Sequence, residues 1–268
     1  MRKITLLLSF LSITLLIYSQ AYGQSLSVGG RLYDKWWSQA AVDEPGEDQP
    51  LWATQSSNTR SGSTTWRCKE CHGWDYKGAA GAYGSGSHFT GFPGVFDAGG
   101  GLSTEELIAR LDGTTNSDHD FSAMGADQLP HLVRFLSEGL VDVAPFIDAE
   151  TKAAIGGDQA HGQELYDGLC ANAVCHSPDG TGINFSGDPA DPDFVGTIAT
   201  GNPWEFIHKV RVGHPASDPL MPATIDLGWS MADVVDVLDY AQTLPTGAPS
   251  STPVEPVGWG EVKQKIAE

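Results

Sequence analysis

All four cysteines of this 268-residue chain stand in two pairs, and a histidine follows each pair directly. The first motif, Cys68–His72, reads Cys-Lys-Glu-Cys-His, and the second, Cys170–His176, reads Cys-Ala-Asn-Ala-Val-Cys-His. Each motif brings two sulfur atoms and an imidazole together within a few residues. Because the chain has no other cysteine, any thiol chemistry is confined to these two short segments, one in each half.

The first motif, C-x-x-C-H, is the attachment signature of c-type haem. In that arrangement the two thiols bond covalently to the vinyl groups of the haem, and the adjacent imidazole binds the iron. The second motif has four residues between its cysteines instead of two, so it departs from the usual spacing but keeps the histidine. The sequence therefore predicts two covalently attached c haems, on Cys68 and Cys71 and on Cys170 and Cys175, with His72 and His176 as iron ligands.

Three other readings use the same cysteines. Each pair can close as a disulfide, the two pairs together can bind zinc through four thiolates, or the C-x-x-C segment can act as a redox dithiol. None of these requires a histidine directly after the second cysteine of a pair. Histidine makes up only 8 of the 268 residues, so finding one in that position twice favours haem.

The N-terminus has the pattern of a secretory signal. Arg2 and Lys3 precede a mostly apolar run, Ile4 to Ile17, and Ala21-Tyr22-Gly23 places small residues before a cleavage point. The apolar run is shorter than the roughly 20 residues that a membrane-spanning helix needs. We therefore expect residues 1–23 to be removed and the mature chain to be periplasmic, without a transmembrane segment.

The chain is strongly acidic, with 34 acidic and 15 basic residues and a formal net charge of −19. Residues 24–150 carry 18 acidic and 8 basic side chains, and residues 151–268 carry 16 and 5, so both halves are acidic. This charge disfavours binding to nucleic-acid phosphates or anionic lipid surfaces, which require a basic footprint. It favours a basic protein partner, or serves solubility.

The same order of predicted secondary-structure elements occurs twice along the chain. A short helix containing Leu-Tyr-Asp, at 30–37 and again at 160–167, precedes each motif, and a glycine-rich stretch with a capped helix follows it. The caps are a Ser103 capping box and an Asn202-Pro203 opening. Each half then has a loop with one methionine and a closing helix. A polar insertion over about 38–66 reads as a loop, and we expect Trp66, Trp74 and Tyr76 to pack it against the first haem.

This repeated order resembles the class I c-type cytochromes, and the tandem arrangement resembles their dihaem members. The resemblance covers about residues 29–140 and 158–245. It implies a mostly α-helical protein with two cytochrome c-like domains, each around one covalent haem, and with long glycine-rich loops. The implied division is a signal peptide at 1–23, a first domain at 24–150 with the insertion at about 38–66, a second domain at 151–246, and a flexible tail at 247–268.

The resemblance also implies a methionine as the second iron ligand in each domain. Met124 lies 52 residues after His72, and Met221 lies 45 residues after His176, each in a loop before a closing helix. A thioether ligand favours reduced iron and raises the potential. A buried methionine is otherwise core filler. Four histidines compete as ligands, namely His88 and His119 in the first half and His208 and His214 in the second, and His119 is only five residues before Met124.

The function that the resemblance implies is electron transfer through two haems with histidine and methionine ligands, without catalysis. We expect redox proteins as partners, with a basic docking surface because both halves are acidic. One alternative is a haem-bearing subunit of a larger oxidoreductase that docks through the insertion. Another is a dihaem enzyme with one open haem site, such as a peroxidase or a thiosulfate-oxidising cytochrome. The sequence disfavours such an enzyme, because it leaves no cysteine for iron ligation and shows no arginine cluster.

Overall fold

The computed structural model describes residues 24–247 as helices joined by long loops. Within that range there is no β-strand, only three isolated bridges, so the expectation of a mostly α-helical chain is confirmed. None of the helices in that range is both long and apolar enough to cross a membrane. The predicted signal peptide, and all of the predicted tail except Gly247, lie outside the described residues.

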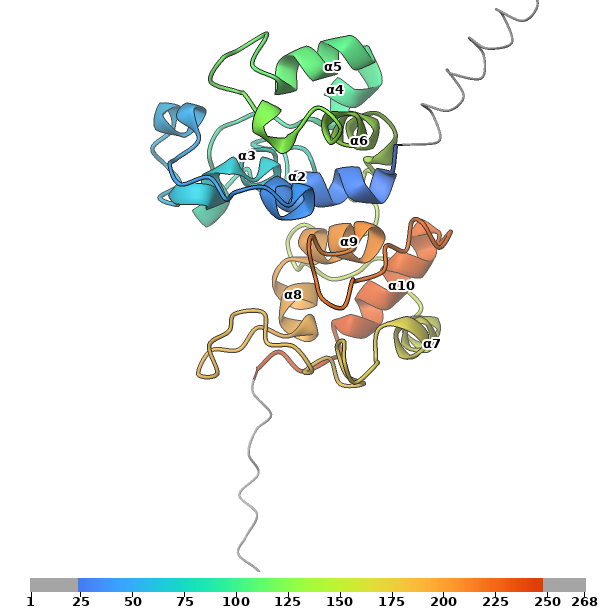
Figure 1. Ribbon diagram of the computed structural model, residues 1–268. Coiled ribbons are helices and arrows are strands. Elements are labelled where there is room, and N and C mark those ends of the chain that lie inside the picture. The colour runs from blue at the N-terminus through green and yellow to red at the C-terminus, as the bar shows by residue number, and fades with distance from the viewer. Residues whose placement is uncertain (1–23, 248–268) are drawn as a thin grey trace, which may run out of the picture.

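The helices form two groups that follow each other along the chain and lie one above the other (Figure 1). The first group contains α2 (Leu26–Ala40), α3 (Cys68–His72), α4 (Phe96–Gly101), α5 (Thr104–Leu111) and α6 (Leu129–Arg134), which continues as a π-helical segment, Phe135–Gly139. Short 3-10 turns lie at Pro50–Thr54, Gly62–Trp66, Gly86–His88 and Ser122–Met124. The second group contains α7 (Gln159–Leu169), α8 (Val195–Gly201), α9 (Pro203–Val212) and α10 (Met231–Ala241).

The helix ends follow from local side-chain chemistry. Ser103 and Glu106 form a reciprocal capping box at the start of α5, as the sequence predicts. Asn202 caps α9 by accepting a hydrogen bond from the Glu205 amide, and Pro203 occupies the first helical position. The left-handed backbone of Gly213, with φ 81°, ends the same helix. These residues fix the starts of α5 and α9 and the end of α9.

The first and last helices of each group pack closely, and a glycine makes each approach possible. A side chain at Gly29 in α2 would overlap the carbonyl oxygen of His131 in α6, and one at Gly162 in α7 would overlap that of Asp236 in α10. Both glycines lie three residues before the leucine of a Leu-Tyr-Asp element. The two groups therefore share one close helix–helix contact, at a glycine in the same position of the same short sequence pattern.

We expect Gly162→Ala to lower the free energy of unfolding by about 1–3 kcal/mol, because the added methyl group overpacks a contact with rigid backbone. Gly168→Ala, in the same helix, is the matched control. Its position is exposed and a side chain there meets nothing within 4 Å, so the change is expected to be neutral or stabilising by up to about 1 kcal/mol. Urea unfolding of both variants measures the difference. Equal urea midpoints for the two variants would contradict the close approach of Gly162 to the Asp236 carbonyl.

Two hydrophobic cores lie inside the two groups, but their boundary differs from the predicted one at residue 150. Val143 and Ile147 are buried in the second core together with Tyr166 and Leu238. The chain leaves the first core after the π-helical segment and crosses to the second near residue 140. Packing therefore assigns residues 141–150 to the second half, which a division based on the motifs does not detect.

The two groups meet where α2 lies against α9 (Figure 1). Gly30 faces Val212, which is itself buried in the first core. The Arg31 guanidinium donates to the Val212 carbonyl at 2.9 Å. His208 Nε2 donates to the Gly30 carbonyl at 3.0 Å, so its Nδ1 accepts from the Tyr76 hydroxyl at 2.8 Å. These buried polar contacts join the halves into one packed body.

Candidate cofactor site

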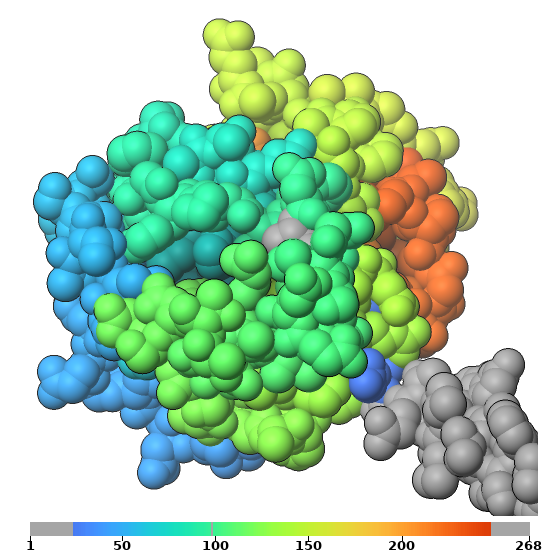
Figure 2. Space-filling model, turned by 90° about the horizontal axis from the view of Figure 1, so that it is seen from above, coloured from blue at the N-terminus to red at the C-terminus, as the bar shows by residue number. Residues whose placement is uncertain are grey.

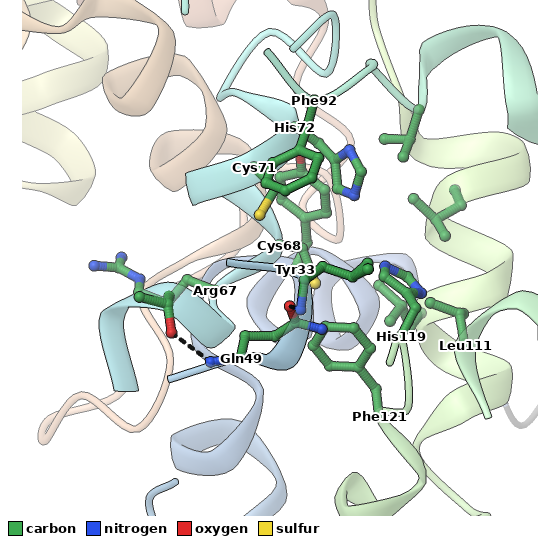
Figure 3. A pocket seen from close by; sticks show the side chains of 15 residues that line it. Tyr33, Gln49, Arg67, Cys68, Cys71, His72, Phe92, Leu111, His119 and Phe121 are labelled. Carbon is green, nitrogen blue, oxygen red and sulfur yellow. Dashed lines mark hydrogen bonds between the residues drawn. The ribbon is translucent and has the colours of Figure 1, made fainter. Parts of the chain in front are cut away.

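The first Cys-Cys-His motif opens onto a cavity of about 580 Å³, measured out to the solvent at its mouth. The Cys68 and Cys71 side chains and the His72 imidazole line it (Figure 3). In the view from above, a hollow lies where the blue, teal and green segments meet, which are the parts of the chain that supply its wall (Figure 2). The apolar part of the wall comes from Leu51, Phe92, Val95, Leu111, Leu132 and Leu136.

The His72 imidazole is fixed in the form that binds a metal. Its Nδ1 is 2.6 Å from the carbonyl oxygen of Pro93. Because a carbonyl oxygen only accepts hydrogen bonds, Nδ1 carries the hydrogen and Nε2 keeps its lone pair. Burial lowers the pKa of His72 to about 4, so the ring is neutral at pH 7. A backbone partner of this kind orients a metal-binding imidazole and sets its tautomer.

The chemistry of the first cysteine pair disfavours the alternatives to a covalent cofactor. All four cysteines of the chain are free thiols in the structure. Burial raises the pKa of Cys68 to about 12 and that of Cys71 to about 12, whereas a redox dithiol needs a lowered pKa. The four sulfurs do not gather as a zinc site. Within residues 24–247 the only close group of three potential ligands is His161, Asp233 and Asp236, which includes no cysteine.

The insertion forms part of the cavity wall. Gln49, Leu51 and Thr65 all line the cavity, and the Gln49 amide donates to the Thr65 hydroxyl at 2.8 Å. Trp66 packs edge-to-face on Phe121, which lines the same cavity, with ring centroids 5.5 Å apart. Trp66 therefore packs the insertion against the wall of this cavity, so the insertion has a structural role at this site.

Trp74 and Tyr76 do not pack the insertion, contrary to expectation. Both are buried, and both rings lie against His208 of the second half, with centroids 4.9 and 6.0 Å away. The reason is the turn after the motif: Gly73 and Tyr76 both adopt left-handed backbone conformations, with φ 76° and 64°. This turn directs the two aromatic side chains away from the insertion and towards α9.

The second motif lies in the same backbone setting as the first, although its cysteines are further apart. The residue after each histidine has a left-handed φ, 76° at Gly73 and 62° at Ser177. Its carbonyl accepts a tyrosine hydroxyl in both halves: Tyr33 donates to Gly73 at 2.6 Å, and Tyr166 donates to Ser177 at 3.1 Å. Both tyrosines belong to the Leu-Tyr-Asp elements.

The turns after the two histidines also close in the same way. The amide six residues further on donates to the histidine carbonyl, from Gly78 to His72 at 2.8 Å and from Gly182 to His176 at 2.9 Å. Two short segments with different cysteine spacing thus adopt one hydrogen-bonding pattern around their histidines. The wider spacing in the second motif therefore leaves the backbone turn after the histidine unchanged.

The second site differs from the first in how its histidine is held. His176 Nδ1 is buried and has no hydrogen-bond partner among the described residues, whereas His72 Nδ1 has Pro93. Burial lowers the pKa of His176 and raises the pKa of Cys170 to about 12. The imidazole is therefore neutral at pH 7, as a metal ligand must be.

The structure does not bring every predicted ligand to a site. Met124 is only 1% exposed and belongs to the first hydrophobic core, and the wall of the first cavity does not include it. His119 does line that cavity. Met221 is half-buried in the loop before α10, where its amide donates to the Ser217 hydroxyl at 2.8 Å.

The three other candidate histidines have roles or positions away from the first cavity. His88 stacks on Tyr83, with centroids 4.4 Å apart, and its Nδ1 lies 3.2 Å from the Glu70 carboxylate. His208 is buried between the halves, as described above. His214 is half-buried, and burial lowers its pKa. None of the three lines the cavity.

The sequence analysis identified the two Leu-Tyr-Asp elements, but it missed the role of their tyrosines at the motifs and the glycines that precede them. Aligning the two Leu-Tyr-Asp elements would have placed Gly29 opposite Gly162, and Tyr33 opposite Tyr166. That alignment was the available signal.

No family model, curated protein or solved structure matches this chain.

Proposed function

We propose that this protein is a periplasmic dihaem electron carrier, with one covalently attached c haem in each half. The observation that carries the proposal is the duplicated setting of the two Cys-Cys-His motifs, which share their backbone turn and their tyrosine hydrogen bond. Two unrelated disulfides or metal sites would not need the same surroundings for the following histidine. Export follows from the signal pattern over residues 1–23.

The residues around the first cavity fit a covalent haem. Cys68 and Cys71 would hold it by thioether bonds, and His72 would bind its iron through Nε2, while the Pro93 carbonyl keeps that ring in place. Once bound, a haem supplies a reversible Fe(II)/Fe(III) couple whose potential depends on axial ligands, burial and hydrogen bonds. The apolar side chains of the cavity wall would shield that couple from water on the side of the protein.

In the second half, Cys170 and Cys175 would hold the haem, and His176 would bind the iron. Met221 stands in the loop before the closing helix and would be the second protein ligand of this iron. A thioether there favours reduced iron and raises the potential. Partners are proposed to be redox proteins with a basic surface, because acidic residues outnumber basic ones in both halves.

The intact mass of the exported wild-type protein tests this proposal. We expect the mass to exceed that of the mature polypeptide by two haem groups, and the additions to persist under denaturing conditions because thioether bonds are covalent. The control is the same chain produced without its N-terminal 23 residues in the cytoplasm, where haem attachment is not expected. A protein without covalent haem would overturn the proposal, and a single addition would reduce it to one haem.

A further inference from the structure

Two histidines face each other across the first cavity. His72 and His119 both line it and project into the space between them (Figure 3). Their ring centroids are 6.3 Å apart. Two imidazoles bound to opposite sides of one metal ion, each through a bond of about 2 Å, hold their centroids about 6 Å apart. The observed separation therefore leaves room for one metal ion between the rings.

Both rings are prepared for binding in the same way. His119 Nδ1 lies 2.7 Å from the carbonyl oxygen of Arg110, as His72 Nδ1 lies 2.6 Å from that of Pro93. Each Nδ1 must therefore be the hydrogen-bearing nitrogen, which leaves each Nε2 with a free lone pair. Within residues 24–247 no hydrogen bond involves Nε2 of either ring. A backbone carbonyl on the far nitrogen is the usual support for a metal-binding histidine.

The loop that carries His119 is firmly closed. Its ends are joined by an antiparallel bridge between Asp112 and Asp120, and the Phe121 amide donates to the Leu111 carbonyl at 2.7 Å. The His119 amide donates to the Asn116 carbonyl at 2.9 Å. The ring also rests against Phe121, with centroids 4.9 Å apart. Both the backbone and the ring are thus held in the orientation that faces His72.

Met124, the ligand implied by the family resemblance, is held elsewhere. It ends the 3-10 turn Ser122–Met124, its amide donates to the Phe121 carbonyl at 3.0 Å, and its side chain is 1% exposed in the first core. Its side chain packs among core residues, some of which also form the cavity wall, but it does not itself line the cavity. The His119 ring already does.

We infer that His119, and not Met124, is the second axial ligand of the first haem. This inference rests on the proposed function, since it presupposes a haem on Cys68 and Cys71. It makes the two haems unlike, with two histidines at the first iron and a histidine with Met221 at the second. Because a thioether raises the potential relative to a second imidazole, the first haem is the lower-potential centre.

The test uses the oxidised full-length holoprotein, after its mass has shown two covalent haems, so that failure of the proposed function is seen separately. Ferric haem with a methionine ligand has a weak near-infrared charge-transfer band. Met124→Leu conserves side-chain volume, and hydrophobic cores tolerate such exchanges. This variant is expected to leave the near-infrared band and both haem potentials unchanged. His119→Ala is expected to alter the spectrum of one haem only and to make it bind added imidazole, which restores the wild-type spectrum.

His131→Ala is the matched histidine control, because His131 lies outside the cavity wall and accepts a hydrogen bond from the Ser25 amide. It is expected to retain the wild-type spectrum and not to bind imidazole. Loss of part of the near-infrared band in Met124→Leu would overturn the inference. The inference would also be overturned if the first haem of His119→Ala kept the wild-type spectrum and did not bind added imidazole. If His119→Ala does not accumulate, the Met124→Leu spectrum decides alone.

Discussion

Replacing Glu70 with alanine is expected to lower the free energy of unfolding by about 3–5 kcal/mol, because it leaves buried charge without its partner. Glu70 lies inside the first motif, between its two cysteines, and its side chain is fully buried. Its carboxylate is 2.7 Å from the Lys69 ammonium, which is itself buried, and 3.2 Å from the Arg60 guanidinium. Urea unfolding of the holoprotein at pH 7 measures the loss.

The same carboxylate predicts a specific dependence on pH. Burial alone would raise the pKa of Glu70, but the His88 hydrogen bond and the nearby Lys69 and Arg60 charges outweigh it and lower the pKa. A group whose pKa is lowered on folding adds stability above its ordinary pKa of about 4.3 and loses it as the pH falls below that value. Glu70→Gln is therefore expected to flatten the acid side of the stability profile.

Glu138→Ala is the matched control for the alanine change. Glu138 is exposed and pairs with Arg134 at 3.1 Å one helical turn away, an arrangement worth less than about 1 kcal/mol. A double variant, Lys69→Met with Glu70→Leu, is expected to recover much of the loss, because neither buried charge remains. Equal effects of Glu70→Ala and Glu138→Ala would show that the Glu70 network contributes little.

The Cys170→Ala, Cys175→Ala double variant is expected to lose one covalent haem completely and to keep the other. The two motifs lie in separate helical groups with separate cores, so attachment at one does not depend on the sulfurs of the other. The intact mass should fall by one haem, and a redox titration should lose one of two waves. The reciprocal variant, Cys68→Ala with Cys71→Ala, should lose the other wave.

The outcome that contradicts this prediction is a double variant that still carries two haems. The wild-type number of haems would then not depend on the widely spaced pair. The expectation for this pair comes from the shared turn around Ser177 and Gly73 rather than from the cysteine spacing. The experiment therefore tests whether that turn is a better guide to attachment than the distance between the cysteines along the chain.

Local patterns predicted the helices but not the contacts between them. Ser103 and Asn202 predict helix starts because each caps its helix through the amide three residues further on, so the pattern is visible in the sequence. The burial of Trp74 against His208 depends on residues more than a hundred positions apart. The mostly α-helical fold could therefore be predicted from the sequence, whereas the boundary between the two cores near residue 140 could not.

The candidate site was predictable to a similar extent. The motif itself identified Cys68, Cys71 and His72, and the structure places all three on one cavity. The contribution of Gln49 and Thr65 to its wall follows from the folding of the insertion, which has no periodic pattern to read. The proposed choice of His119 over Met124 as a ligand depends on which way a loop turns, and the four residues between them do not reveal this.

The double glycine of α2 has a consequence for how electrons would move inside the molecule. Gly29 lies against α6 and Gly30 against α9, so one helix serves as an inner wall of both halves. Domains joined only by a linker must first collide before their centres exchange electrons. Here α2 packs against both halves, so transfer between the two proposed haems would need no encounter between separate domains. The rate of that transfer would then not depend on solvent viscosity.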